Sequence, residues 1–200
     1  EEAAVVVGEL VEGVRIENVG KSVGWPVGPL ALEVEVSQKL SLDIIDAQIA
    51  MGLRKPEDDP PPQGTALMRC LLNEHGRGGR VHGGGYYEYS ESGKAIWSKL
   101  KALYFKEGVD SAISDADIRD RLLFRPVIES LVCLQDGVLR SVADGNIGSI
   151  MGIGAPSWTG GYLQFVNTYG LKRFAERCTT LAEAYGERFR APAIVADKIA

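Results

Sequence analysis

The sequence predicts an all-α protein made of two tandem helical repeats, and three observations support this fold class. Apolar residues recur at helical spacing over most of the chain, most regularly over residues 171–185. Clusters of glycine and proline, at residues 24–32 and 152–161, interrupt these runs as tight corners. The same order of helix, Gly-Val turn, short helix, Gly-x-Pro corner and apolar helix occurs twice, with the turns at Gly13 and Gly137.

The first repeat, residues 1–105, begins with a helix over residues 1–12, although the valines at 5–7 would also suit a strand. Gly13 ends this helix, and a short polar stretch leads to the first corner. A further helix is expected from Ser41, as its cap, to about residue 53.

The rest of the first repeat contains an exposed connection, a helix and a glycine-rich loop. Residues 55–63 hold four prolines and three acidic residues, which predicts an exposed connection. A helix over residues 65–74 follows. The loop at residues 76–89 is expected to be folded, because its tyrosines can pack their rings. A helix over residues 94–105 then closes the repeat.

The second repeat, residues 106–200, is expected to begin with the longest helix of the chain. Ser114 and Asp117 form a capping signal before an apolar face that runs to Val138. Pro126 lies inside this helix and predicts a kink or a local break. Ser141 then caps a shorter helix, with Asp144 in its first turn.

That shorter helix is expected to end at Gly152, where the second corner begins. Helical spacing over residues 162–169 places Gly170 where a left-handed cap ends a helix. The last helix covers residues 171–185 and is stopped by Gly186 and Pro192. Because neither repeat is large enough to bury its own apolar faces, the two are expected to pack together as an internal pseudo-dimer.

Composition excludes several classes of protein. A formal net charge of −5 argues against nucleic acid as a partner, which would require a clustered basic face. No run reaches the length of a membrane span. Cys70, Cys133 and Cys178 are far apart in apolar runs, which predicts buried free thiols in a reducing compartment, the cytoplasm. The chain begins inside a helical pattern, so we expect a fragment of a longer protein.

Three motifs give the chain a family resemblance. Gly24-Trp-Pro-Val-Gly-Pro-Leu resembles the Gly-x-Pro-Met-Gly-Pro segment in the C-terminal domain of 3-hydroxyacyl-CoA dehydrogenases. Residues 79–89 are similar to the family's Gly-Arg-Lys-x-Gly-x-Gly-Phe-Tyr-x-Tyr signature, with Val81 in place of the lysine. Residues 117–138 and the second corner resemble the second copy of this domain in the multifunctional fatty-acid oxidation enzyme alpha subunit.

The resemblance implies a fold like the C-terminal domain of 6-phosphogluconate dehydrogenase. It also implies an NAD-dependent 3-hydroxyacyl-CoA dehydrogenase of fatty acid β-oxidation, an oxidoreductase of lipid metabolism. In this family, the nucleotide-binding domain and the catalytic His–Glu pair lie N-terminal to the matched region. NAD is therefore expected to bind a domain missing from this chain, and we expect no catalytic residue, no bound metal and no activity in the chain alone.

Substrate contact is expected at the first corner, where Trp25, Pro26, Gly28 and Pro29 would help wall the acyl-CoA cleft. A weaker candidate is a phosphate site in the glycine-rich loop. Its guanidinium groups lie beside permissive backbone and could bind a phosphate such as that of CoA. The phosphate candidates, with a neighbouring histidine, are Arg77, Arg80 and His82.

The remaining polar and aromatic candidates are expected to be structural. His75 and His82 are predicted to be solvated loop residues, and their spacing lacks further ligands for zinc. Trp97 and Trp158 are expected in the core or at a domain interface. The Asp120-Arg121 pair replaces an Asn-Arg pair of the family's first copy, which favours a structural role.

Two alternatives from other classes stay open. The chain could be a non-catalytic helical interaction module that docks a thiolase subunit or a second copy of itself. It could also be a non-catalytic module that binds acyl-CoA.

Overall fold

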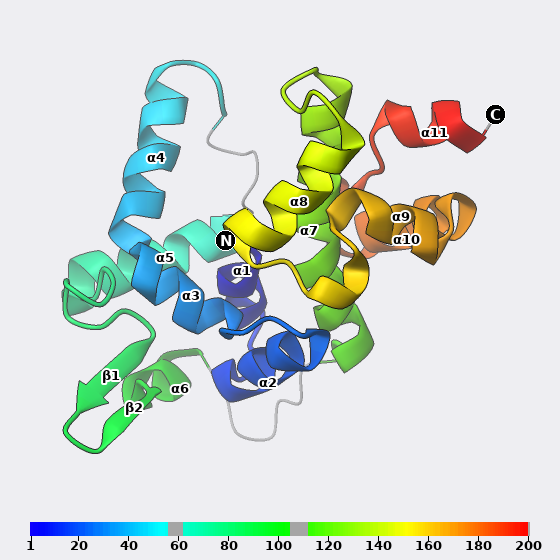
Figure 1. Ribbon diagram of the computed structural model, residues 1–200. Helices are drawn as coiled ribbons and strands as arrows, with labels where there is room; N and C mark the ends of the chain where they lie inside the picture. The colour runs from blue at the N-terminus through cyan, green and yellow to red at the C-terminus, as the bar shows by residue number, and fades with distance from the viewer. Residues whose placement is uncertain (56–61, 105–111, 200) are drawn as a thin grey trace. The chain divides into compact units, whose positions relative to one another are not determined.

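The computed structural model describes residues 1–55, 62–104 and 112–199 of the 200-residue chain (Figure 1). It confirms the all-α prediction, with one small hairpin as the only sheet in the described residues. The chain forms two compact units: Glu1–Gly20 with Val27–Ser114, and Lys21–Pro26 with Asp115–Ala200. The packing of two repeats as a pseudo-dimer stays a prediction, and most of the expected connection at 55–63 lies outside the described residues.

The first unit is built around a buried helix, α1 (Glu2–Gly8), which packs on α5 (Pro62–His75). Five consecutive residues of α1, from Ala3 to Val7, are buried, so the valine run is a helix and the strand alternative is wrong. A Cβ added at Gly64 would lie 2.8 Å from Val5 Cγ2, which shows how closely the two helices approach. Helix α1 ends at Gly8, so it is shorter than the helix expected over residues 1–12.

Residues expected to form a short polar stretch are in fact helix α2 (Gly13–Val23). Gly13 opens this helix; it does not merely end the previous one. Ile16, Val19 and Val23 are buried at one side of α2, while Val14, Asn18 and Lys21 are exposed. Polar residues and glycines make up most of α2, which hides the helical period in the sequence and explains the error.

Two short helices follow the first corner: α3 (Pro29–Val36) and α4 (Gln38–Ala50). The cap of α4 is Ser37 and not Ser41, because the Ser37 hydroxyl accepts a hydrogen bond from the Leu40 N–H at 3.4 Å. Ser37 has a φ of 88°, so the chain turns sharply between the two helices. The predicted helix is correct in type but begins too late.

The glycine-rich loop is folded, as expected, and it leads into a hairpin that the sequence did not predict. Strands β1 (Tyr87–Ser90) and β2 (Gly93–Ile96) pair antiparallel, with Tyr87 opposite Ile96. The expected helix from residue 94 is therefore wrong at its start; α6 (Ser98–Tyr104) follows the hairpin. Gly93 has a φ of 128°, which suits the tight turn between the strands.

The second unit begins with α7 (Asp115–Gln135), the longest helix of the described residues, as predicted. The helix continues through Pro126, so a local break is wrong, and the Ser130 hydroxyl donates to the Pro126 carbonyl at 2.8 Å. The helix ends before Val138, which is 72% exposed and not inward-facing as expected.

The other helices of the second unit follow the sequence prediction closely. Ser141 caps α8 (Val142–Ile153) by accepting from the Asp144 N–H at 3.1 Å, and Gly154 ends that helix in the left-handed conformation. Gly170 has a φ of 93° but a ψ of 120°, so it is a sharp link and not the expected left-handed cap. Gly186 stops the last long helix as predicted. The elements after α7 are α8 (Val142–Ile153), η1 (Ser157–Thr159), α9 (Tyr162–Tyr169), α10 (Leu171–Tyr185), η2 (Glu187–Phe189) and α11 (Ala193–Ile199).

Aromatic rings from three helices form the core of the second unit. Phe124 of α7 stacks on Phe174 of α10 with ring centroids 4.8 Å apart, and it meets Phe165 of α9 edge to face at 5.9 Å. Within the described residues, no helix is both long enough and apolar enough to cross a membrane.

Candidate functional site

The first corner is divided between the two compact units. Trp25 and Pro26 belong to the second unit, whereas Gly28 and Pro29 belong to the first. Gly28 and Pro29 form the entry to α3, where Pro29 is the first helical residue. The candidate substrate residues are therefore held by two different sets of neighbours.

A buried carboxylate holds the half of the corner that belongs to the first unit. Glu17 of α2 is only 4% exposed, and its Oε1 accepts hydrogen bonds from the N–H groups of Leu30 at 2.7 Å and Ala31 at 3.0 Å. These are free donors at the start of α3, so Glu17 caps that helix from another element. A Cβ at Gly28 would collide with this carboxylate, so glycine is required there.

Sequence reasoning missed Glu17. Glu17 directly follows the apolar Ile16 and lies two residues before Val19. This position within an apolar helical pattern was the available signal that its side chain is buried. Tyr87 lies beside Glu17 and connects the hairpin to this cap. Burial, followed by the negative charge of Glu17, raises the pKa of Tyr87 far above its ordinary value.

The half of the corner in the second unit is held by the second corner. The Trp158 indole N–H donates to the Val23 carbonyl at 2.5 Å. Gly24 has a φ of 107°, and a Cβ there would lie 3.3 Å from Pro156 Cβ. Trp25 is half-buried and packs against the apolar core of this unit. Trp158 itself is 59% exposed, so of the two expected places, the core and a domain interface, the core is wrong.

The two candidate phosphate ligands already have partners. Arg77 donates from Nε to the Gly85 carbonyl at 2.8 Å and from a terminal nitrogen to the Tyr87 carbonyl. Its guanidinium lies 4.4 Å from the Trp97 ring centroid, and burial lowers its pKa. Arg80 is exposed and forms an ion pair with Glu35 at 3.0 Å. Arg77 thus stabilises the loop, and phosphate binding by either residue stays a prediction.

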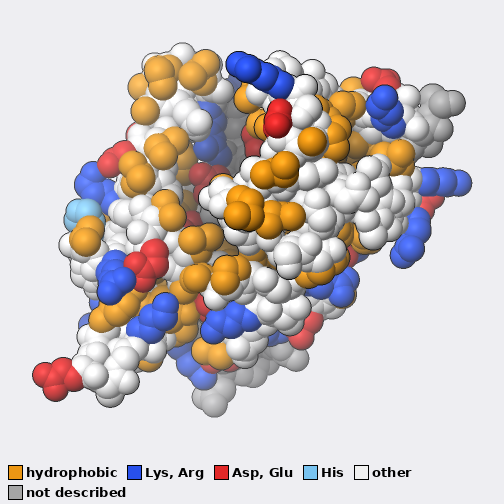
Figure 2. All heavy atoms as spheres, viewed as in Figure 1, with side chains coloured by type: hydrophobic (Ala, Val, Ile, Leu, Met, Phe, Trp, Pro, Cys, Tyr) orange, Lys and Arg blue, Asp and Glu red, His pale blue; other side chains and the backbone are white. Residues whose placement is uncertain are grey.

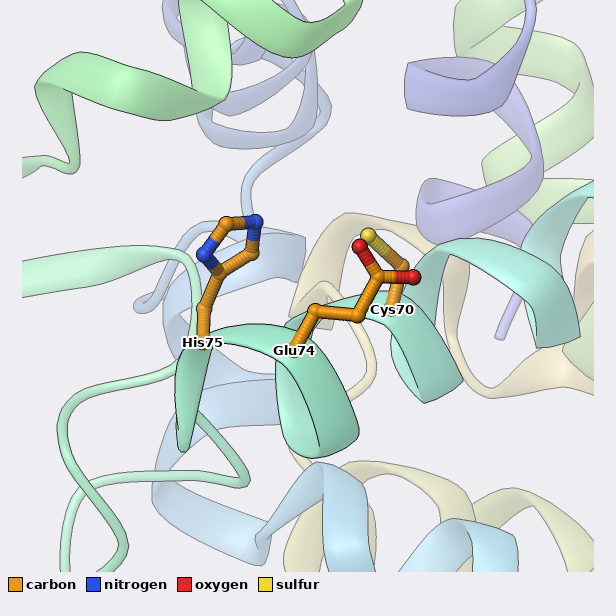
Figure 3. Close-up of side chains that lie close together, drawn as sticks. All are labelled: Cys70, Glu74 and His75. Carbon is orange, nitrogen blue, oxygen red and sulfur yellow. The ribbon is translucent and has the colours of Figure 1, made fainter.

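The two histidines lie in different environments. His82 is exposed, as predicted for a solvated loop residue. His75 is not in the loop: it is the last residue of α5, it is half-buried, and its ring meets the buried Trp97 ring edge to face at 5.1 Å. Ligand atoms of His75, Cys70 and Glu74 lie within 4.8 Å of one another (Figure 3), a grouping that the sequence did not predict.

All three cysteines are free, but only one is buried. Cys178 is fully buried in the second unit, and burial raises the pKa of its thiol to about 12. Cys70 and Cys133 are half-buried, which corrects the prediction of three buried thiols. The pattern failed for these two because they lie at the edges of their helices' apolar faces.

The Asp120-Arg121 pair makes the contacts that a structural role requires. Asp120 accepts from Arg177 Nε at 2.8 Å and from Arg119 Nε at 3.0 Å. Arg121 is fully buried, with its guanidinium 4.3 Å from the Tyr185 ring centroid. The Arg177–Asp120 hydrogen bond and the Arg121–Tyr185 contact join α7 to α10 inside the second unit.

The first unit also contains a largely apolar pocket of about 250 Å³. Val7, Val11, Trp97, Leu100 and Tyr104 are among its lining residues. A nucleotide site of the parallel-sheet type needs parallel strands, and the strands found in residues 1–55, 62–104 and 112–199 form only the antiparallel hairpin.

Comparison with known proteins identifies relatives among the alpha subunits of the fatty acid oxidation complex. The chain is 35% identical over 176 residues, 88% of its length, to the fatty acid oxidation complex subunit alpha of Vibrio vulnificus (strain CMCP6). It is 35% identical over 183 residues, 90% of its length, to the subunit of the same name from Vibrio cholerae (strain ATCC 39315). The same subunit of Shewanella sp. (strain ANA-3) is 33% identical over 204 residues, covering 94% of the chain.

The match covers only part of each relative. The chain spans 24% of the Vibrio vulnificus subunit, 25% of the Vibrio cholerae subunit and 27% of the Shewanella subunit. It therefore spans about a quarter of the length of the curated relatives it matches. No family model matches the chain.

Proposed function

Because the chain is homologous to about a quarter of the alpha subunit of the fatty acid oxidation complex, we propose that it is the helical C-terminal part of an NAD-dependent 3-hydroxyacyl-CoA dehydrogenase. The activity belongs to the longer protein, which oxidises the 3-hydroxyl group of an acyl-CoA in fatty acid β-oxidation. Near-complete coverage of this chain by those relatives, together with the motifs at both corners, supports the assignment.

NAD binding and proton transfer are assigned to other parts of that longer protein. The described strands form one short hairpin, which offers no crevice for a dinucleotide. The chain's own contribution is structural and positional: it walls one side of the acyl-CoA cleft and holds its helices together. We place the protein in the cytoplasm, because its three free cysteines suit a reducing compartment.

Substrate contact is assigned to the first corner. Glu17 fixes Gly28 and Pro29 at the entry of α3, and the second corner fixes Val23 and Gly24. Trp25, which is half-buried, lies between these two anchors in the sequence. An aromatic ring on a backbone held from both sides is suited to contact an acyl chain at low entropic cost.

The proposal is tested by measuring NADH formation from NAD and a 3-hydroxyacyl-CoA. The chain alone should be inactive, and the longer protein that contains it should turn over. Turnover by the isolated chain would contradict the division of labour proposed here. An inactive longer protein, folded and loaded with NAD, would remove the dehydrogenase assignment.

Docking of another subunit is a second candidate, favoured by exposed apolar residues on α8. Ile147 is 63% exposed, Met151 81% and Ile153 64%, and Figure 2 shows hydrophobic side chains gathered on this helix. A thiolase subunit or a second copy of the chain would cover them. Sedimentation with and without thiolase tests this: a strict monomer in both runs removes the docking role.

A further inference from the structure

One side-chain cluster in the first unit has no part in the proposed function. Cys70, Glu74 and His75 lie on α5, and one ligand atom from each is within 4.8 Å of the other two. Figure 3 shows the three side chains rising from the same side of the helix, with the Cys70 sulfur beside the Glu74 carboxylate. It is the one such group of metal-binding residue types found in the described part of the chain.

His75 supplies an independent sign that a ligand belongs here. Its Nε2 is buried and has no hydrogen-bond partner among the described residues. A buried polar nitrogen without a partner costs free energy, and most such atoms in folded proteins are satisfied. The ring cannot turn freely toward solvent, because Trp97 packs against it edge to face with centroids 5.1 Å apart.

The donor set selects the type of ion. A thiolate, an imidazole and a carboxylate together suit zinc, whereas magnesium and calcium prefer oxygen ligands alone. The charges of a thiolate and a carboxylate would offset those of a divalent cation. Tetrahedral zinc with bonds of 2.0–2.3 Å separates its ligands by about 3.3–3.8 Å, so the side chains need to approach by only about 1 Å.

We propose that Cys70, Glu74 and His75 bind one zinc ion per chain, with the fourth position left for water or an external ligand. Binding replaces the thiol proton of Cys70, which is released to solvent. The site is separate from the corner assigned to acyl-CoA contact, which contains none of these residues.

Tyr104 is placed to orient the sulfur. The Tyr104 hydroxyl lies within hydrogen-bond reach of the Cys70 sulfur. Hydrogen bonds from such neighbours fix metal ligands and tune their affinity. Tyr104 also lines the pocket of about 250 Å³, so that pocket lies next to the zinc site.

The test is a titration of the reduced, metal-free chain with Co²⁺ and then Zn²⁺. One equivalent of cobalt should give a thiolate-to-cobalt charge-transfer band in the near ultraviolet, and zinc should remove it. Cys70→Ser should abolish the band, while His75→Gln and Tyr104→Phe should each weaken binding by about tenfold or more. Matched controls are Cys133→Ser and His82→Gln, which should leave the titration unchanged.

A labelling experiment gives a readout that does not depend on a variant's folding. Zinc should protect Cys70, but not Cys133, from alkylation by iodoacetamide in the unmodified chain, as read by mass spectrometry. The proposal is overturned if the unmodified chain binds neither metal, if the band survives Cys70→Ser, or if zinc protects both thiols equally.

Discussion

Replacing Glu17 with alanine should unfold the first corner more than any exposed acidic substitution does. The carboxylate accepts two hydrogen bonds from the start of α3, at 2.7 and 3.0 Å, while being only 4% exposed. Leaving two buried N–H groups without partners costs about 1–3 kcal/mol each. We therefore expect Glu17→Ala to lower the free energy of unfolding by about 3–5 kcal/mol.

Urea denaturation followed by circular dichroism measures this loss as a lower midpoint with an unchanged slope. Glu91→Ala, an exposed glutamate in the hairpin turn, is the matched control and should stay within about 0.5 kcal/mol of the unmodified chain. Gly28→Ala forces a Cβ into the same carboxylate. The double variant should therefore lose less than the sum of the two single losses. Full additivity, or a loss below about 1 kcal/mol for Glu17→Ala, would refute the capping role.

Three further predictions concern other parts of the chain. Gly161→Val should unfold the second unit, because Gly161 has a φ of 104° and a Cβ there collides with Asn146. The control is Gly148→Ala: Gly148 has open space around it, so this variant should be neutral or more stable by up to about 1 kcal/mol. A folded Gly161→Val variant with lost acyl-CoA binding would reverse the scaffold assignment. Arg69 lowers the pKa of the exposed Asp46 carboxyl. The stabilisation that this ion pair gives the folded state is therefore present at neutral pH and is lost as pH falls through the folded-state pKa of Asp46. Asp46→Asn should therefore cost at most about 1 kcal/mol at pH 7 and nothing in acid, and a cost that grows in acid urea titrations would contradict this. Cys178, with its thiol pKa raised to about 12, should resist iodoacetamide until the chain unfolds, and labelling in the native chain at the rate of Cys133 would disprove its burial.

Helix type was predictable wherever an apolar face dominates. The longest helix, α7, and the last long helix, α10, each carry several apolar residues at helical spacing, and both were found near their expected bounds. Ser141 was likewise a reliable cap, since its hydroxyl makes a purely local bond. A single sequence therefore predicts best the features that depend on nearby residues, such as a helical apolar face or a local cap.

Features that depend on distant partners were missed. Helix α2 shows few apolar residues, and Glu17 within it acts on a helix 13 residues later. Ser37 adopts a φ of 88° that its neighbours impose, so the start of α4 was misplaced. The segment from Gly93 was predicted to be a helix, because only its pairing with β1 distinguishes a strand from a helix there.

The candidate sites, like the fold, were only partly predictable from the sequence. The first corner was identified from its glycines and prolines, but the carboxylate that holds it was not. The grouping at Cys70 was overlooked because His75 was assigned to the loop and not to the last turn of α5. Once His75 is helical, it shares a helix with Cys70 and Glu74, and the three can meet.

The central claim is that this chain supplies one wall of an acyl-CoA cleft, and one kinetic measurement tests it most directly. In the longer protein, Trp25→Ala should raise the KM for a 3-hydroxyacyl-CoA by about tenfold, equivalent to about 1.4 kcal/mol. The KM for NAD, measured in the same assays, should not change. An unchanged KM for the acyl-CoA, or an equal rise in both constants, would contradict the proposed wall.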